Sequence, residues 1–211
     1  MRDGKGSNVK LIFLYLMQVV LTIRRNRILR KYLTKDMNII GDFGCGHFAN
    51  KYANVLVDQF CSFDEQRGGL KLKKQISGRT CHDVNLNEFP YPFADKEFDF
   101  LICSHVLEHL DDPVHACVEF SRIAKAGYIE VPYGSVDVLI RKNEIIHKWL
   151  CSYDKVEKVL YFLDRKRSLD LLQPFSMNIV MRFLIQLQSV AVTWNDRIEG
   201  KYLTIRREEE Q

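Results

Sequence analysis

The chain has 211 residues, 46% of them hydrophobic and 27% charged, with a net charge of +4. This length and composition support one domain with a full core and exclude wholesale disorder. The mild positive excess is unlike the basic, patterned surface of a dedicated nucleic-acid-binding protein, so no nucleic-acid partner is expected. Much of that excess lies in residues 24–31 and 165–167, which we interpret as solvated faces.

The cysteines indicate the redox environment. None of the six forms a Cys-x-x-Cys pair; they are Cys45, Cys61, Cys81, Cys103, Cys117 and Cys151. Several fall in apolar runs, where cysteine packs as a small hydrophobic residue. The pattern predicts reduced thiols in a cytoplasmic protein rather than a disulfide framework.

The N-terminal segment is first apolar and then strongly basic. Residues 8–33 are predicted to form one long helix or two, and residues 11–23 within them are almost wholly apolar. This run is too short to predict a transmembrane span, which needs about 20 apolar residues. No small-residue cleavage site follows, so a cleaved signal peptide is not expected. Two alternatives remain open, namely packing on the core and peripheral contact with an anionic membrane.

Short apolar runs recur through the centre of the chain and alternate with helical stretches. This alternation predicts parallel strands joined by crossover connections. The predicted strands are residues 37–40, 54–58, 81–84, 98–103 and 126–132. The clearest helix is predicted over residues 113–124, because Pro113 suits a first helical turn. The apolar residues expected to share one side of it are Val114, Cys117, Val118 and Ile123.

The remaining third of the chain is predicted to be more mixed. Residues 159–163 are predicted to form a strand within an insertion, and residues 178–188 return to helical spacing. Residues 189–194 and 201–205 are predicted to pair as an antiparallel hairpin that closes one edge of the sheet.

A glycine turn after the first predicted strand carries the strongest signal for a ligand site. Asp42 is followed by Gly44, Cys45 and Gly46, and the glycines allow a tight turn and a close approach of a ligand. A pyrophosphate at this turn would be repelled by the Asp42 carboxylate. The pattern therefore favours a cationic ligand such as S-adenosylmethionine over NAD.

Four segments in order resemble the class I S-adenosylmethionine-dependent methyltransferases, in their small methyltransferase-domain branch. They are residues 41–46 (GDFGCG), 89–99 (FPYPFADKEFD), 103–113 (CSHVLEHLDDP) and 127–132 (GYIEVP). The resemblance implies a doubly wound α/β fold with a mostly parallel sheet of about seven strands. It also implies methyl transfer from S-adenosylmethionine, and it says almost nothing about the acceptor.

The resemblance also implies a set of cofactor-binding residues, which are Asp42, Gly44, Cys45, Gly46, Asp58, Asp83, Val84 and His105. Asp42 would lie near the amino-acid moiety of the cofactor, and Asp58 would accept hydrogen bonds from the ribose hydroxyls. Asp83 would meet the adenine amino group, with Val84 supplying a backbone N–H. The alternative for the acids is that they are exposed residues at strand ends.

Residues 105–109 read His-Val-Leu-Glu-His, which matches the His-x-x-Glu-His pattern of inverted zincins. Two histidines four residues apart on one helix face could hold zinc. The methyltransferase order of the flanking segments disfavours this interpretation, so no metal is predicted. His105 is then expected at the cofactor rim, with Glu108 and His109 as structural residues.

The acceptor side of the site is predicted near residues 147–149, after the fifth strand. His147 or His105 is the best candidate for a catalytic base, and Tyr133 and Tyr153 are weaker candidates for the acceptor wall. The alternative is a packing Trp149 beside a surface His147.

Residues 1–35 are predicted to be a helical extension, and residues 36–211 the methyltransferase domain, with an acceptor-side insertion at about 133–175. The short gap between Gly46 and Asp58 leaves room for a helix of only a turn or two. This shortening and the segment 66–69 resemble a subgroup associated with glycans or secondary metabolites, so a small-molecule or glycan-type acceptor is predicted. The other functions considered are a nucleotide-binding oxidoreductase and a non-catalytic methyltransferase-like binding module.

Overall fold

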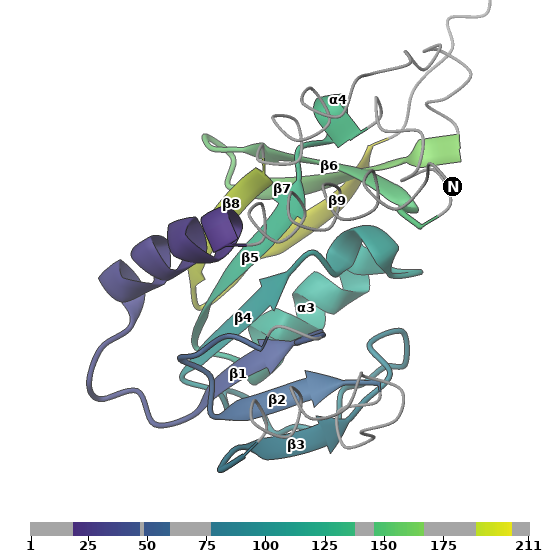
Figure 1. Ribbon diagram of the computed structural model, residues 1–211. Helices are drawn as coiled ribbons and strands as arrows, with labels where there is room; N and C mark the ends of the chain where they lie inside the picture. The colour runs from purple at the N-terminus through teal and green to yellow at the C-terminus, as the bar shows by residue number, and fades with distance from the viewer. Residues whose placement is uncertain (1–18, 47–48, 60–76, 138–145, 167–188, 204–211) are drawn as a thin grey trace, which may run out of the picture.

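The computed structural model describes residues 19–46, 49–59, 77–137, 146–166 and 189–203. Within them the chain forms a six-stranded sheet in the order β3-β2-β1-β4-β5-β8 and a three-stranded sheet in the order β6-β7-β9 (Figure 1). The larger sheet contains or adjoins the segments that resemble a methyltransferase domain.

The larger sheet is mostly parallel, as predicted. Its strands are β1 (Ile40–Phe43), β2 (Val55–Asp58), β3 (Thr80–Asp83), β4 (Phe100–Ser104), β5 (Ala126–Pro132) and β8 (Ser189–Asn195). β8 pairs antiparallel with β5, and the other pairs are parallel. The doubly wound fold class is therefore confirmed, although the described sheet has six strands and not about seven.

Helices cover both faces of this sheet (Figure 1). Residues 19–32 are helical and bury Leu21, Arg25 and Leu29, which are four residues apart and so share one face. Leu29 packs against Phe100 and its neighbours on the sheet. This part of the predicted N-terminal helix therefore packs on the core.

The helix α3 (Pro113–Ile123) covers the other face. Asp112 caps it, since Asp112 Oδ1 accepts a hydrogen bond from the His115 backbone N–H at 2.8 Å. Cys117, Phe120 and Ile123 are buried as their helical spacing requires. Val118, predicted on the same side, is instead 59% exposed, because its position falls on the solvent face.

The second sheet contains β6 (Trp149–Asp154), β7 (Val159–Asp164) and β9 (Glu199–Leu203). The predicted strand at 159–163 is thus confirmed. The predicted hairpin is wrong, because β8 and β9 lie in different sheets and β9 runs parallel to β7. The chain turns away at Asp196, which has φ of 65° and is bonded by Lys96 Nζ at 2.9 Å.

The loop between β1 and β2 differs from its prediction. β1 begins at Ile40, so Asp42 lies inside the strand and not after it. The described residues between β1 and β2 form turns and no helix, whereas a helix of one or two turns was predicted. The segments 66–69 and 178–188 lie outside the described residues.

Two arginines predicted on solvated faces are buried. Arg25 pairs with Glu130 at 2.9 Å, and Arg165 pairs with Asp137 at 2.7 Å. Each guanidinium satisfies a buried carboxylate, which explains why a charge at these positions leaves the surface. Among the described helices, none has the length and apolar character needed to cross a bilayer.

The described cysteines Cys45, Cys81, Cys103, Cys117 and Cys151 are free thiols. Four of them are buried among apolar side chains, as small hydrophobic residues. Burial raises the pKa of Cys117 to about 12, so this thiol stays protonated.

Candidate functional site

Three acids lie at the carboxyl ends of adjacent parallel strands. Asp42 is the third residue of β1, and Asp58 and Asp83 end β2 and β3 and are paired in register. The crevice beyond these strand ends is where open α/β sheets bind ligands. The structure therefore brings the three predicted acids to one edge of the sheet.

Asp42 is a buried carboxylate that is only partly compensated. It is 5% exposed, and Oδ2 accepts a hydrogen bond from the Asn50 backbone N–H at 2.7 Å. Burial raises the pKa of Asp42 to about 6, against the opposing effects of the Asn50 amide and Arg25. A cationic group beside this carboxylate would offset the cost of its burial.

The two glycines of the turn have different roles. Both have positive φ, 69° for Gly44 and 50° for Gly46. A Cβ at Gly44 would lie 2.3 Å from Val106 Cγ2, so packing by itself requires glycine there. Among the described residues, a Cβ at Gly46 would have only the Gly44 carbonyl oxygen nearby, at 3.9 Å, so these residues leave the space beside Gly46 open. The neighbouring Cys45 is buried.

Asp58 shapes the same turn. Its Oδ2 accepts a hydrogen bond from the Gly46 backbone N–H at 2.9 Å, which ties the glycine turn to the end of β2. The Val84 backbone N–H donates to the Asp58 carbonyl oxygen at 3.1 Å. Val84 was predicted to offer this N–H to an adenine, and the structure instead uses it inside the protein. The Asp83 side chain is exposed at the end of β3.

His105 follows β4 directly, beside these strand ends. Its φ of 56° is unusual for a residue other than glycine, and its backbone N–H donates to the Glu130 carbonyl oxygen at 2.7 Å. Burial lowers the pKa of His105, but the interactions with Glu108 and Glu130 outweigh it and raise the pKa overall. The side chain is 31% exposed.

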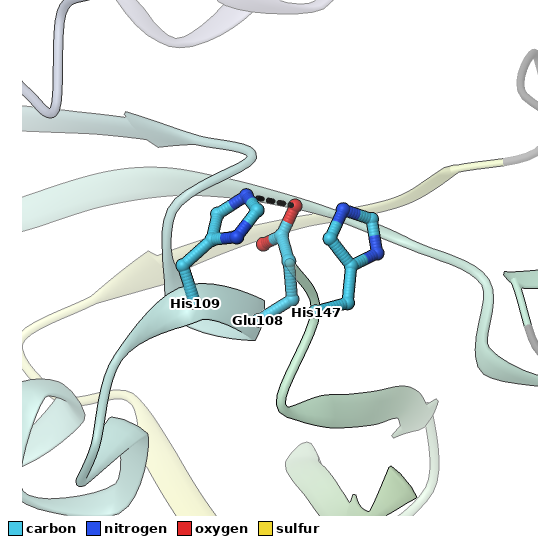
Figure 2. A group of neighbouring side chains, drawn as sticks. All are labelled: Glu108, His109 and His147. Atoms are coloured by element: carbon cyan, nitrogen blue, oxygen red, sulfur yellow. Dashed lines mark ion pairs between the residues drawn. The ribbon is translucent and has the colours of Figure 1, made fainter. Parts of the chain in front are cut away.

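A second group of polar side chains joins two segments that are far apart in sequence. Glu108 and His109 lie in the short helix η1 (Leu107–His109), and His147 lies just before β6. One ligand-type atom from each of the three residues lies within 4.8 Å of the other two. Figure 2 shows the two imidazole rings on either side of the Glu108 carboxylate.

The structure changes the interpretation of the His-x-x-Glu-His sequence. Because η1 is a 3₁₀ helix of three residues that begins after His105, the two histidines of the motif do not share a helix face. His109 instead meets His147, with their ring centroids 4.7 Å apart. The Lys148 backbone N–H donates to the Glu108 carbonyl oxygen at 2.8 Å and holds the two segments together.

His147 is oriented through its Nδ1 atom by residues that the sequence analysis missed. Its Nδ1 lies 2.8 Å from Oδ2 of Asp137, which ends the short helix α4 (Gly134–Asp137). Asp137 Oδ2 also accepts from Arg165 Nη1 at 2.7 Å. His147 is thus largely buried and oriented, and not the surface residue of the alternative reading. Nothing in the local sequence signals this contact, because it joins residues 10 and 28 positions apart.

The remaining candidates near this group have packing roles or line a separate groove. Trp149 Nε1 donates to the Leu110 carbonyl oxygen at 2.8 Å, as expected for a packing tryptophan. Tyr133 and Tyr153 line a groove of about 900 Å³ together with cationic residues that include Arg24 and Lys155. His147 and the strand-end acids do not line this groove.

The comparison with known protein families agrees with this architecture. Residues 41–129 match a family described as a methyltransferase domain. The match spans β1 to β5, including the glycine turn, the strand-end acids and η1. Residues 41–129 are therefore similar to a methyltransferase domain, in agreement with the predicted resemblance.

The solved structures that are similar to parts of this chain are distant in sequence. The YcgJ protein from Bacillus subtilis has 16% identity and a TM-score of 0.43, with 54% of this chain and 57% of that one covered. A protein from Pyrococcus horikoshii has 18% identity and a TM-score of 0.43, with 75% and 71% covered. Coclaurine N-methyltransferase, solved with N-methylheliamine and SAH, has 15% identity and a TM-score of 0.39, with 55% and 36% covered.

Among curated proteins, none matches this chain significantly. The chain also spans little more than half of the first matching structure, since 57% of the YcgJ protein is covered. Methyl transfer is accordingly the reaction class that the family match supports.

Proposed function

We propose that the protein transfers a methyl group from S-adenosylmethionine to a small-molecule or glycan-type acceptor. One observation carries the proposal. Asp42, Asp58 and Asp83 converge at the carboxyl edge of a parallel sheet whose sequence matches a methyltransferase domain. That edge is the ligand-binding edge of open α/β sheets.

The residues at this edge fit the chemistry of that cofactor. The Asp42 carboxylate is buried and its pKa is raised to about 6, so an ammonium group nearby would stabilise its charge. The space that the described residues leave beside Gly46 allows close approach to the backbone, because glycine has no Cβ to fill it. Asp58, at the end of β2, is the residue proposed to hold the ribose hydroxyls, and Asp83 the adenine amino group.

When bound, the cofactor supplies an activated methyl group on a sulfonium centre. The contribution of this chain is binding and alignment, because an in-line displacement needs the nucleophile, methyl carbon and sulfur in a row. The glycine turn is held to β2 by the Gly46–Asp58 hydrogen bond, which fixes the site before a ligand arrives. An oxygen nucleophile would also need a base, and we propose His105 for that role because it directly follows β4 at this edge.

Calorimetric titration with S-adenosylhomocysteine tests the cofactor. Wild-type protein is expected to bind it, whereas Asp58→Ala should lose at least about tenfold in affinity, since hydrogen bonds to charged groups are worth about 1.5–3 kcal/mol each. Asp95→Asn is the matched control, because Asp95 is an exposed acid that pairs with Arg122 away from the strand ends. Equal affinity in wild-type and Asp58→Ala protein would contradict the site assignment.

A thermal-shift comparison separates the alternative functions. Stabilisation by NAD or NADP, with no response to S-adenosylhomocysteine, would indicate an oxidoreductase. No response to any of the three would favour a non-catalytic binding module. Stabilisation by S-adenosylhomocysteine alone is the result that this proposal expects.

We also propose that the protein is cytoplasmic and touches an anionic membrane through its N-terminal segment. The apolar run 11–23 followed by basic residues supports this contact. Residues 11–18 of that run lie outside the described residues, and Val20 and Ile23 within the described helix are 45% and 62% exposed.

A further inference from the structure

We propose that Glu108, His109 and His147 form a binding site for a divalent first-row transition-metal ion of the Zn²⁺ type. The site joins η1 to the segment before β6 (Figure 2). It contains none of the strand-end acids that are proposed to bind the cofactor. Neither the inference nor its test depends on the proposed methyl transfer.

The hydrogen bonds of the two histidines fix where their protons are. His109 Nδ1 lies 2.8 Å from the Ile146 carbonyl oxygen, and a carbonyl oxygen can only accept, so Nδ1 carries the proton. His147 Nδ1 likewise faces the Asp137 carboxylate at 2.8 Å. In the neutral ring this leaves a lone pair on the Nε2 atom of each histidine. Figure 2 shows a ring nitrogen of each histidine turned towards Glu108.

Glu108 completes the set with a buried carboxylate that forms no hydrogen bond with the described residues. The residue is 0% exposed, and within the described part of the chain neither Oε1 nor Oε2 has a hydrogen-bond partner. The nearest ring nitrogens are His105 Nδ1 at 3.5 Å and His109 Nε2 at 3.8 Å from Oε1, both beyond normal hydrogen-bond length. A buried carboxylate that forms no hydrogen bond of normal length is costly, and a bound cation would reduce that cost.

The donor types select the class of metal. Two neutral imidazole nitrogens and one carboxylate oxygen are a common ligand set for Zn²⁺ and related ions, whereas Mg²⁺ prefers oxygen ligands only. With metal–ligand distances of about 2.0–2.2 Å, tetrahedral ligand atoms are about 3.4 Å apart. The 3.8 Å between His109 Nε2 and Glu108 Oε1 is close to this, and the ligand atoms of all three residues lie within 4.8 Å of one another.

The surroundings have the other features of a metal site. Each histidine donates its second ring N–H to a fixed acceptor, which is how metal-binding histidines are usually oriented. Asp137 is itself held by the buried Arg165. The His109 side chain is 38% exposed, so an ion can enter from solvent. Three protein ligands leave further coordination positions for water or a substrate oxygen.

Calorimetry on the purified full chain tests the site. After treatment with a chelator, the wild-type protein is expected to bind one equivalent of Zn²⁺ and to gain thermal stability from it. Glu108→Gln and His147→Ala should each weaken Zn²⁺ binding by more than about 100-fold, because losing even an outer partner costs about 10–100-fold. His115→Ala is the matched control, since His115 is an exposed histidine of α3 whose ring stacks on Phe89.

A fold check keeps the result interpretable. Glu108→Gln preserves the shape of the side chain, and the metal-free variant should melt no lower than the metal-free wild type. The proposal is overturned if the wild type binds no stoichiometric Zn²⁺, or if folded Glu108→Gln binds Zn²⁺ as tightly as the wild type. Binding of Mg²⁺ without Zn²⁺ would also overturn it, because the histidine ligands would then be unused.

Discussion

Glu130 and Glu108 are both buried carboxylates beside the carboxyl ends of the central strands, but they differ in the donors that surround them. Glu130 lies in β5, is 1% exposed and pairs with Arg25 at 2.9 Å. Hydroxyl groups of Ser104, Tyr128 and Ser189 donate to it at 2.9, 3.0 and 2.6 Å. Glu108 has no donor among the described residues.

The two carboxylates differ in how far their charge is compensated. Burial alone would raise the pKa of Glu130, but Arg25 and the surrounding groups lower it to about 2. Glu130 is thus a permanently ionised anchor that fixes the N-terminal helix to the sheet. Glu108 faces His105 and His109 nitrogens at 3.5 and 3.8 Å but forms no hydrogen bond with the described residues, so its charge is less fully compensated. Asp42, with one backbone donor, lies between the two cases.

Removing the satisfied carboxylate should have the largest effect. Glu130→Ala leaves Arg25 buried and unpaired, which should lower the free energy of unfolding by about 3–5 kcal/mol. Urea denaturation measures this loss, with the exposed Glu88→Ala as the control, expected within about 0.5 kcal/mol of wild type. A loss below 1 kcal/mol for Glu130→Ala, on the same scale, would mean that the network is not an anchor.

The intermediate case, Asp42, should make the free energy of unfolding depend on pH. The pKa of Asp42 is raised from 3.8 to about 6 in the fold, so the folded state holds a proton that the unfolded chain has released between these values. The contribution of Asp42 to the free energy of unfolding is therefore fully present below about pH 4. It falls by about 3 kcal/mol in total as the pH rises to about 6. Asp42→Asn should lack this fall.

The measurement for Asp42 is the unfolding free energy of wild type and Asp42→Asn at pH 4 and pH 7. The difference between the two proteins isolates Asp42 from the other titrating groups. If this difference does not change with pH, the burial cost assigned to Asp42 is wrong. In the proposed function, affinity for S-adenosylhomocysteine should also weaken below about pH 6, as the carboxylate is neutralised.

Neutralising the unsatisfied carboxylate should have the opposite sign from removing Glu130. In metal-free protein, Glu108→Gln should raise the free energy of unfolding by about 1 kcal/mol, because it removes a buried charge that forms no hydrogen bond of normal length among the described residues. Urea denaturation in the presence of a chelator checks the sign. A clear destabilisation would show that Glu108 has an internal partner, as Glu130 does.

The smallest effect concerns the outer side of the helix that Arg25 anchors. Arg25 pairs with Glu130 on the buried face of residues 19–32, so only the exposed face of this helix is available to a membrane. Changing Val20 and Ile23 to serine should reduce flotation with anionic vesicles by a few-fold without unfolding the protein. Val156→Ser is the control, since Val156 is 91% exposed in the β6–β7 turn. Equal flotation of both variants would contradict membrane contact through this face.

Patterns within short segments were enough to predict the fold class. The apolar runs at 54–58 and 126–132, the glycine turn and the helix from Pro113 all lie close to their predicted positions. Each depends on periodicity or turn chemistry among neighbouring residues, and the chain order of such elements specifies a parallel sheet. The acids at the strand ends follow from the same logic, because parallel strands present their carboxyl ends at one edge.

Only the tertiary structure decided the features that depend on distant partners. The placement of β9 beside β7, the burial of Arg25 and Arg165, and the approach of His147 to Glu108 join segments tens of residues apart. Local sequence shows a charge or a histidine, but it does not show which group will face it after packing. Since a buried charge is stabilised by its partner and not by its neighbours in sequence, these contacts could be read only from the folded chain.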